Sequence, residues 1–286
     1  DEIVAKVVCE YLVDPELRAE GHELLNDTLQ TQLRGTMVGM SWAARQGRVD
    51  LAAPASICAS AFPTPKVQDA RSANAAVARA KTHNVEMKIW AIAESDLRRV
   101  CIQDSSFDPR KKERSQHGWI LAYSTPALAA GKEAPLSIIN WNSKKLRRKA
   151  DSSLLCEAQS ACISFGKWLQ ASVLEMTLRF ADYHRRDPLY DKQWEPPTVL
   201  SKKKTAAVDP AGLLIMDAKS LFDALHNEQA GQDDARSALE ASMVKEDLER
   251  LGAVPRWVPY DKNPSDALTK HETAHSAPLY LSLIHI

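Results

Sequence analysis

The sequence predicts an α/β fold in which helices flank a mixed β-sheet, preceded by a smaller helical region. Three observations lead to this prediction. Before about residue 84, apolar and small residues recur at helical spacing. Three short apolar segments with turn-like connections follow. After residue 153, helical and strand-like segments alternate, which is typical of α/β chains.

Residues 1–83 are expected to form the helical region. Its first part, 15–33, is polar and helix-like, and the next, 34–62, is rich in small apolar residues. Pro63 and Pro65 then separate it from a third helical segment, 66–81. No cluster of Asp, Glu, His or Cys occurs here, so the sequence indicates a packing role.

From about residue 84 the apolar period changes to two. Alternate positions from Val85 to Ala91 are apolar, which predicts a first strand. Three more apolar segments run into Asp104, Ser124 and Asn142, and their turn-like connections favour an antiparallel meander.

The second half predicts helices interleaved with strands. Interleaving of this kind favours a mixed sheet. In chain order, the expected elements are a helix from Ser153 to about Tyr183, a Pro-rich charged insertion over 184–210, a strand at 213–216, a helix from Ala218, a helix at 235–251, a strand at 253–260 and a short helix after Pro264.

Composition excludes some classes of function. Lys and Arg together number 37, as do Asp and Glu, so any nucleic-acid contact has to rest on local patches. The five cysteines are scattered without CxxC spacing, which argues for a reducing, intracellular compartment and against a zinc site. No signal peptide and no apolar run long enough to span a bilayer is found, so no membrane partner is expected.

Both ends of the chain are expected to be unnatural. It begins at Asp1 and not at methionine, as a fragment would. Residues 273–286 are expected to form a tail. Its last part, Leu281 to Ile286, is what a sequencing-library adapter would encode, and it is excluded from the prediction of the fold.

Four acidic residues stand at the ends of these predicted elements. Asp104 and Asp217 end strands, Glu157 lies in the first turn of the long helix, and Asp266 opens the last helix. If they converge at one sheet edge, they cannot all stay ionised without cations. Mg²⁺ prefers such oxygen ligands, and two ions roughly 3.5–4 Å apart make a phosphoryl-transfer site.

Each acidic residue also has an ordinary structural explanation. Asp104 would cap a turn, Glu157 would favour the helix dipole, and Asp217 and Asp266 would be helix N-caps. Spacing alone does not decide between these explanations and a metal site, so the flanking segments carry the argument.

Five segments occur in a fixed order around the acidic residues. Together they resemble the ribonuclease H domain of copia-type long-terminal-repeat retrotransposon polyproteins. They read CIQDSSFD, SQHGWILAY, INWNSKKLRRKADSSLLCEAQSA, LLIMDAKSLFDAL and VPYDKNPSDALTK.

The resemblance assigns each acidic residue to a motif. Asp104 begins the family's Asp-Ala-Ser/Asp motif, and Glu157 is the acidic residue of Ser-Ser-x-x-x-Glu-Ala. Asp217 begins Asp-Ser/Ala-Lys-Ser, and Asp266 is the acidic residue of Asn-Pro-Ala-Asp-x-x-Thr-Lys. The Ser-Gly-Tyr strand start is matched by Gln116 to Trp119, and Trp-x-Ser-Lys-Lys by Trp141 to Lys145.

Upstream, LRGTMVGMSWAARQGRVDLAA resembles the segment that follows the polymerase palm, with Val49 where the family usually has Pro. Residues 1–83 would then be the C-terminal remnant of the reverse transcriptase, similar to a thumb or connection. Residues 84–272 would be the ribonuclease H-like domain. The resemblance covers about residues 30–270.

The resemblance implies Mg²⁺-dependent hydrolysis of the RNA strand of RNA–DNA hybrids during reverse transcription, with Mn²⁺ as a substitute ion. It implies that Asp104 bridges two metal ions, that Glu157 and Asp217 complete the shell of one, and that Asp266 completes the other. The implied partners are the hybrid and the rest of the polyprotein. The implied location is a cytoplasmic virus-like particle or the nucleus.

Substrate contacts are expected beside the acidic site. A basic run would hold phosphates against the repulsion of the carboxylates. Ser105 and Asn142 are candidates for hydrogen bonds to a sugar 2′-hydroxyl. The run comprises Lys144, Lys145, Arg147, Arg148 and the neighbouring Lys149.

Departures from the family keep other functions open. No Tyr-x-Asp-Asp polymerase motif occurs, the 184–210 insertion is long, and no histidine lies between Arg256 and Ser265. His271 and His275 follow in a polar tail. The alternatives are a degenerate, catalytically inactive copy that binds hybrid, a domain that only positions hybrid, and another nuclease of the same fold.

Overall fold

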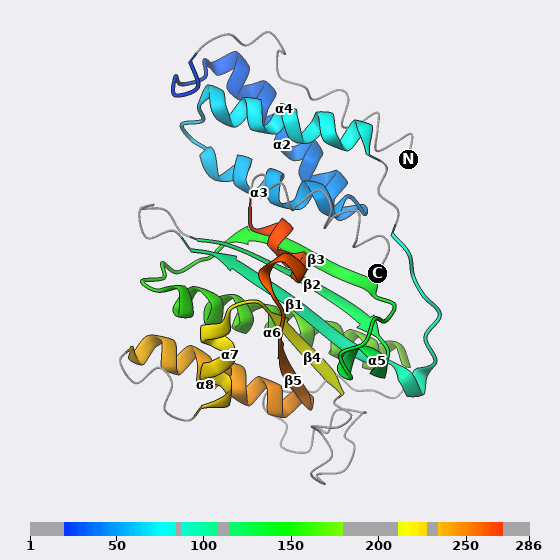
Figure 1. The fold of residues 1–286 in the computed structure, drawn as a ribbon. Helices are drawn as coiled ribbons and strands as arrows, with labels where there is room; N and C mark the ends of the chain where they lie inside the picture. The colour runs from blue at the N-terminus through cyan, green and yellow to red at the C-terminus, as the bar shows by residue number, and fades with distance from the viewer. Residues whose placement is uncertain (1–19, 84–86, 108–114, 180–210, 228–233, 271–286) are drawn as a thin grey trace.

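A five-stranded mixed β-sheet with helices against both faces forms the centre of the protein (Figure 1). The computed structural model describes residues 20–83, 87–107, 115–179, 211–227 and 234–270. The 184–210 insertion, the 273–286 tail, His271 and His275 lie outside the described residues.

The strand order is β3-β2-β1-β4-β5. β1 pairs antiparallel with β2, and β2 with β3, whereas β1–β4 and β4–β5 are parallel pairs. The predicted antiparallel meander and the mixed sheet are both confirmed. The strands are β1 (Arg98–Ser106), β2 (Gln116–Ser124), β3 (Ser137–Lys145), β4 (Gly212–Met216) and β5 (Ala253–Trp257). The short helix α5 (Pro126–Ala129) joins β2 to β3.

Three helices cover one face of the sheet: α6 (Ser153–Arg179), α7 (Lys219–His226) and α8 (Ala235–Leu251). Successive side chains of a strand point to opposite faces. Cys101 of β1 therefore lies in one hydrophobic cluster with Ala158 and Phe165 of α6, while its neighbours Val100 and Ile102 face the other way.

The other face is covered by α3 (Ala52–Ala61), and α2 (Asp27–Arg45) and α4 (Val67–Thr82) pack on α3. Their buried residues and those of the sheet form one hydrophobic cluster, which includes Leu33, Cys58, Val100 and Ile120. The helical region is therefore a layer of the same hydrophobic core.

Two polar contacts join this helical layer to the sheet. Gln116 of β2 donates through Nε2 to Ser56 Oγ of α3 at 2.8 Å. Trp141 of β3 donates through Nε1 to the carbonyl of Ala44 at 3.0 Å. Both donors come from segments that were compared with the retrotransposon family, so those segments also have a structural role.

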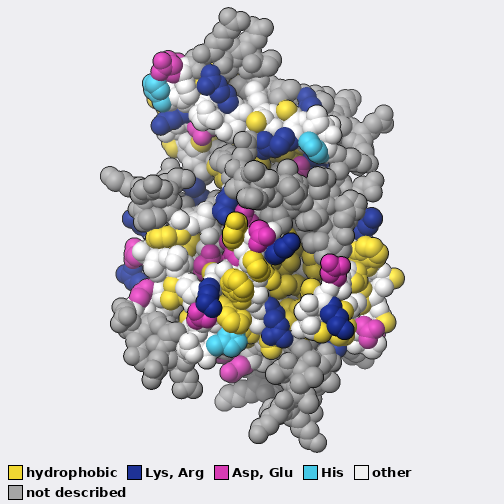
Figure 2. Space-filling model, viewed as in Figure 1, with side chains coloured by type: hydrophobic (Ala, Val, Ile, Leu, Met, Phe, Trp, Pro, Cys, Tyr) yellow, Lys and Arg dark blue, Asp and Glu magenta, His cyan; other side chains and the backbone are white. Residues whose placement is uncertain are grey.

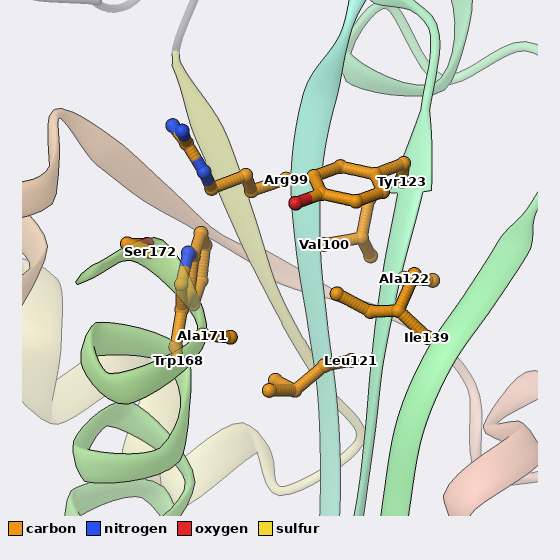
Figure 3. A pocket seen from close by; sticks show the side chains of 9 residues that line it. All are labelled: Arg99, Val100, Leu121, Ala122, Tyr123, Ile139, Trp168, Ala171 and Ser172. Atoms are coloured by element: carbon orange, nitrogen blue, oxygen red, sulfur yellow. The ribbon is translucent and has the colours of Figure 1, made fainter. Parts of the chain in front are cut away.

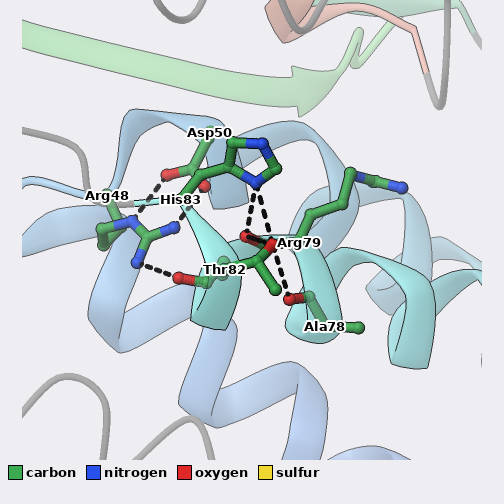
Figure 4. Close-up of polar contacts among 7 residues, drawn as sticks. Arg48, Asp50, Ala78, Arg79, Thr82 and His83 are labelled. Atoms are coloured by element: carbon green, nitrogen blue, oxygen red, sulfur yellow. Dashed lines mark hydrogen bonds and ion pairs between the residues drawn. The ribbon is translucent and has the colours of Figure 1, made fainter.

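Arg48 ties the helical layer together (Figure 4). Its guanidinium donates to both carboxylate oxygens of Asp50, at 2.9 and 2.6 Å, and to the carbonyl of Ala80 at 2.7 Å. Asp50 lies in the 3₁₀ turn η1 (Val49–Leu51), and Ala80 lies in the last turns of α4. The ion pair is largely buried, so losing either partner would leave a charge without compensation.

The prediction of a strand over residues 85–91 is wrong for residues 87–91, the part that the structure describes. Residues 87–93 have no regular structure and lead into the 3₁₀ turn η2 (Glu94–Asp96). Ile89 is 70% exposed, and the N–H of Trp90 donates to the side chain of Ser137, not to a strand backbone. Alternation alone did not give this segment a partner strand or a buried face.

The C-terminal elements are shorter than expected. β5 ends at Trp257, and two 3₁₀ turns follow, η3 (Tyr260–Lys262) and η4 (Pro264–Leu268). The short helix expected after Pro264 is thus a 3₁₀ turn. Among the described helices, none has the length and apolarity needed to cross a membrane.

Deleting the helical layer tests whether the division near residue 84 separates two folding units. The sequence predicts that residues 81–275 fold alone. The shared hydrophobic cluster leads us to expect instead that this fragment exposes the sheet face around Val100, Ile102 and Ile120, and so loses a cooperative thermal transition. Circular dichroism melts of the fragment and the full chain measure this, and a sharp transition in the fragment would support independent folding.

Candidate metal centre

Three carboxylates meet at the carboxyl end of β1 and β4. Asp104 belongs to β1, Glu157 to α6, and Asp217 follows β4 directly. One oxygen from each lies within 4.8 Å of the other two. β1 and β4 are parallel neighbours, so their ends share one edge, and α6 packs against β1. The predicted convergence of these three residues is therefore observed.

Hydrogen bonds from neighbouring groups orient two of the carboxylates. Glu157 accepts from Gln103 Nε2 at 3.2 Å and from the N–H of Ser105 at 3.3 Å. Asp104 accepts a hydrogen bond from the hydroxyl of Thr269. These donors come from β1 and from the residue directly after η4, so two separate segments hold the cluster.

The environment of the cluster disfavours negative charge. Burial, followed by the charge of Asp217, raises the pKa of Asp104 to about 7. Burial and the charge of Asp104 raise the pKa of Glu157 well above its ordinary range, and burial also raises the pKa of Asp217. Three ionised carboxylates at this separation need a cation. The donors are all carboxylate oxygens, which fits a hard divalent ion such as Mg²⁺.

Asp266, the fourth predicted residue, lies beside the other three and not within their group. It is buried in η4, and its carboxylate forms an ion pair with Lys270. Its charge contributes to the raised pKa values of Asp104 and Asp217. The structure therefore places Asp266 within electrostatic reach of the cluster, with one of its oxygens paired to an ammonium.

Asn263 and Gly118 allow η4 to lie against the sheet. Asn263 Oδ1 accepts from the N–H and hydroxyl of Ser265, and its Nδ2 donates to the carbonyl of Gln103 at 3.2 Å. Gly118 pairs with Asp104 in the β1–β2 register. A Cβ at Gly118 would overlap the side chain of Leu268 and lie 3.2 Å from its carbonyl carbon. The missing side chain therefore leaves room for the turn that carries Asp266.

Three of the ordinary structural explanations for the acidic residues fail. Ala218 is the N-cap of α7 and no side chain caps that helix, so Asp217 is not its cap. Asn263, and not Asp266, caps η4. We expected Glu157 in the first turn of the long helix. Glu157 is instead the fifth residue of α6 and lies beyond that turn, so the helix dipole does not account for its position.

The basic run lies at the same end of the sheet as the carboxylates. Lys144 on β3 pairs with His117, next to Gly118, and two strand spacings put β3 about 10 Å from β1. Asn142, Lys144, Arg147 and Arg148 are exposed, and Lys145 is partly exposed. Arg148 forms an ion pair with Glu240 at 2.5 Å.

Ser105 differs from the other predicted substrate contacts because it is buried, with its N–H bonded to Glu157. Over the described surface seen in Figure 2, acidic and basic side chains are interspersed. This agrees with the balanced composition, and any phosphate contact depends on the local basic run.

Several residues of the site received no role from the sequence. Thr269 and Lys270 lie within the quoted Asn263–Lys270 motif, so their position was visible although their contacts were not. Gln103 precedes Asp104 in β1, so the Gln103 side chain points to the sheet face opposite that of Asp104. The Gln103 side chain therefore points to the face covered by α6, which carries Glu157. Strand alternation is the signal in the sequence from which the position of Gln103 can be inferred.

A small pocket lies at the other end of β1 (Figure 3). Side chains of β1, β2 and β3 face Trp168, Ala171 and Ser172 of α6 there, and Arg99 pairs with Glu175 at 2.8 Å. About 10 Å³ is open to the centre of a water molecule, enough for about one water. This pocket is too small for a nucleotide and is separate from the carboxylates.

Searches of the sequence against protein-family models and against curated proteins found no match.

Replacing Gly118 by Ala tests how η4 is placed. The added methyl group would push Leu268, and with it the turn carrying Asp266, away from the sheet. We expect a loss of about 1–3 kcal/mol in unfolding free energy, as for other overpacked sites. Urea denaturation measures it. Gly166→Ala on α6, where a methyl group meets nothing within 4 Å, is the control and should not destabilise.

Replacing Asp104 by Asn tests the electrostatic state of the metal-free cluster. Native Asp104 holds its proton more tightly than the unfolded chain does, so it contributes stability that is lost as pH rises from 3.8 to about 7. At pH 8 in EDTA, Asp104→Asn should therefore be more stable, by at least about 1 kcal/mol or roughly 2–4 °C in Tm.

The same melts from pH 5 to 8 should show a steeper loss of Tm in the unchanged chain than in Asp104→Asn. His117, whose pKa burial lowers to about 4, contributes equally to both proteins, so their difference reports the titration of Asp104 together with its coupling to Glu157. Millimolar Mg²⁺ should stabilise the unchanged chain at pH 8 and leave Asp104→Asn nearly unaffected. A variant less stable than the unchanged chain in EDTA would contradict this electrostatic account.

Proposed function

We propose that the protein is a ribonuclease H-type nuclease that hydrolyses the RNA strand of RNA–DNA hybrids with two Mg²⁺ ions. One observation carries the proposal. Asp104, Glu157 and Asp217 come from three separate elements and meet within 4.8 Å, and each stands in a segment that resembles a catalytic motif of the retrotransposon enzymes.

The architecture is compatible with this proposal. A five-stranded mixed sheet with helices on both faces agrees with a ribonuclease H-like fold. We propose that helices α2 to α4 derive from the end of a reverse transcriptase. They cover the sheet face opposite α6, where an upstream polymerase segment would connect to the nuclease.

The residues present suit two divalent ions. Asp104, Glu157 and Asp217 would hold one ion, and Asp266 together with Asp104 would hold the other. When bound, such ions supply a hydroxide nucleophile near neutral pH and stabilise the leaving oxygen. Gln103 and the Ser105 N–H orient Glu157, and Thr269 orients Asp104, so the carboxylates keep their positions. Mn²⁺ would replace Mg²⁺ because it also accepts oxygen ligands.

The basic run would hold the substrate backbone. Lys144, Lys145, Arg147 and Arg148 lie at the same sheet end as the carboxylates and would neutralise phosphates of the hybrid. Asn142 is exposed on β3 and would reach a sugar, while Ser105 would act through its backbone at Glu157. The remaining polyprotein, with its polymerase upstream, would be the protein partner inside a virus-like particle or the nucleus.

One observation favours the inactive alternative, a degenerate copy that binds hybrid. The ammonium of Lys270 already pairs with Asp266, so the fourth carboxylate is partly neutralised without a metal ion. In such a copy the basic run would still bind hybrid, and no cleavage would follow.

Replacing Asp217 by Asn separates the two accounts. The change removes one negative charge and keeps the shape, so folding should survive, since Asp217 does not cap α7. Cleavage of a labelled RNA–DNA hybrid with Mg²⁺ should fall by about 10²-fold or more, because metal and electrostatic terms dominate phosphoryl transfer. Asp223→Asn on the exposed side of α7 is the matched control and should cleave normally.

Equal cleavage by the Asp217→Asn variant and the unchanged chain would remove Asp217 from the proposed site. If the folded, unchanged chain binds hybrid but does not cleave it with Mg²⁺ or Mn²⁺, the inactive alternative is correct.

A further inference from the structure

Lys270 places a positive charge at the edge of the carboxylate cluster. Its Nζ pairs with Asp266 Oδ1, four residues earlier. The two ends of this pair differ in environment, because the Asp266 side chain is 5% exposed and the Lys270 side chain is 40% exposed. The ammonium therefore reaches inward from solvent to a buried carboxylate.

Contacts of the preceding residue bring this ammonium close to the rest of the cluster. Thr269 donates its hydroxyl hydrogen to Asp104, so residues 269–270 lie beside the carboxylate cluster. The charge of Lys270 acts on Asp104 and Asp217 as well as on Asp266. One monovalent cation thus faces three carboxylates, while Glu157 is held by Gln103 and the Ser105 N–H.

We propose that Lys270 is a tethered counter-ion that occupies the position of the second divalent ion at Asp266 and must be displaced before that ion binds. The inference rests on the proposed function, because it assumes that the cluster binds metal. A divalent ion at Asp104, Glu157 and Asp217 leaves the Lys270 pair intact, whereas an ion at Asp266 competes with it for the same oxygen.

The side chain of Lys270 is suited to displacement. Lysine has a flexible four-carbon stem, and the Lys270 side chain is partly exposed, so the ammonium can move into water while the stem stays on the protein surface. The two metal sites should therefore differ in affinity. The three-carboxylate site fills first, and the Asp266 site fills at a higher ion concentration because a cation is already present.

Calorimetric titration of the full chain with Mn²⁺ and with Mg²⁺ tests the proposal. Lys270→Met removes the charge and keeps the stem, and Lys270→Gln keeps a hydrogen-bond donor for Asp266. In both variants the ion at the weaker site, the Asp266 site, should bind at least about tenfold more tightly than in the unchanged chain, which corresponds to 1.4 kcal/mol. In an Asp266→Asn background, Lys270→Met should change the affinity by less than about threefold, because the competed oxygen is altered.

Lys167→Met is the matched control for the loss of one positive charge. Lys167 is exposed on the same helix as Glu157 and bonds only to Gln170 among the described residues. Ten residues of helix put it about 15 Å from Glu157. The metal affinities of the Lys167→Met variant should equal those of the unchanged chain, and circular dichroism should show that all variants are folded.

The outcomes separate this inference from the proposed function. If the unchanged chain binds metal and neither Lys270 variant binds it more tightly, the counter-ion role is wrong and the nuclease proposal stands. If neither the unchanged chain nor the Lys270 variants bind metal, both proposals are wrong. If only the Lys270 variants bind a second ion, the lysine excludes that ion, which supports the counter-ion role.

Discussion

Repulsion among the carboxylates of Asp104, Glu157 and Asp217 is the constraint around which this edge of the sheet is built. Three acidic oxygens within 4.8 Å, largely withdrawn from water, favour protons or cations over free negative charge. The raised pKa values of all three express that preference. A fold that keeps such a cluster loses stability without a cation, as functional sites commonly do.

The surrounding structure holds the cluster by several independent means. The parallel pairing of β1 and β4 brings two strand ends together, and α6 lies across β1 with Glu157 on its inner side. Gly118 lets η4 approach the sheet, and Asn263 fixes the start of that turn. The N-terminal helices close the opposite face through a shared hydrophobic cluster, so the layer that appeared separate in sequence supports the sheet that carries the site.

Cations of two kinds can offset the repulsion among the carboxylates. Lys270 provides one from within the chain, and divalent ions would provide the other. The ammonium of Lys270 is part of the chain and is therefore always present, whereas binding of divalent ions depends on their concentration. The proposed competition would distinguish Asp266 from the three clustered carboxylates, although all four stand in segments that were compared with the same family.

The sequence by itself determined most of the elements and three of the four acidic positions at the cluster. Buried strands, the long helix and α8 follow from apolar period and from helix-forming composition, which are local properties. Residues 87–91, the described part of the strand predicted over 85–91, form no strand because alternation does not guarantee a partner, and Ile89 stays exposed. Tertiary structure alone decided that Asp217 is no helix cap, that Lys270 pairs with Asp266, and that α2 to α4 share the core of the sheet. These depend on contacts between residues far apart in the chain or on the direction in which a side chain points, and neither is encoded in local spacing.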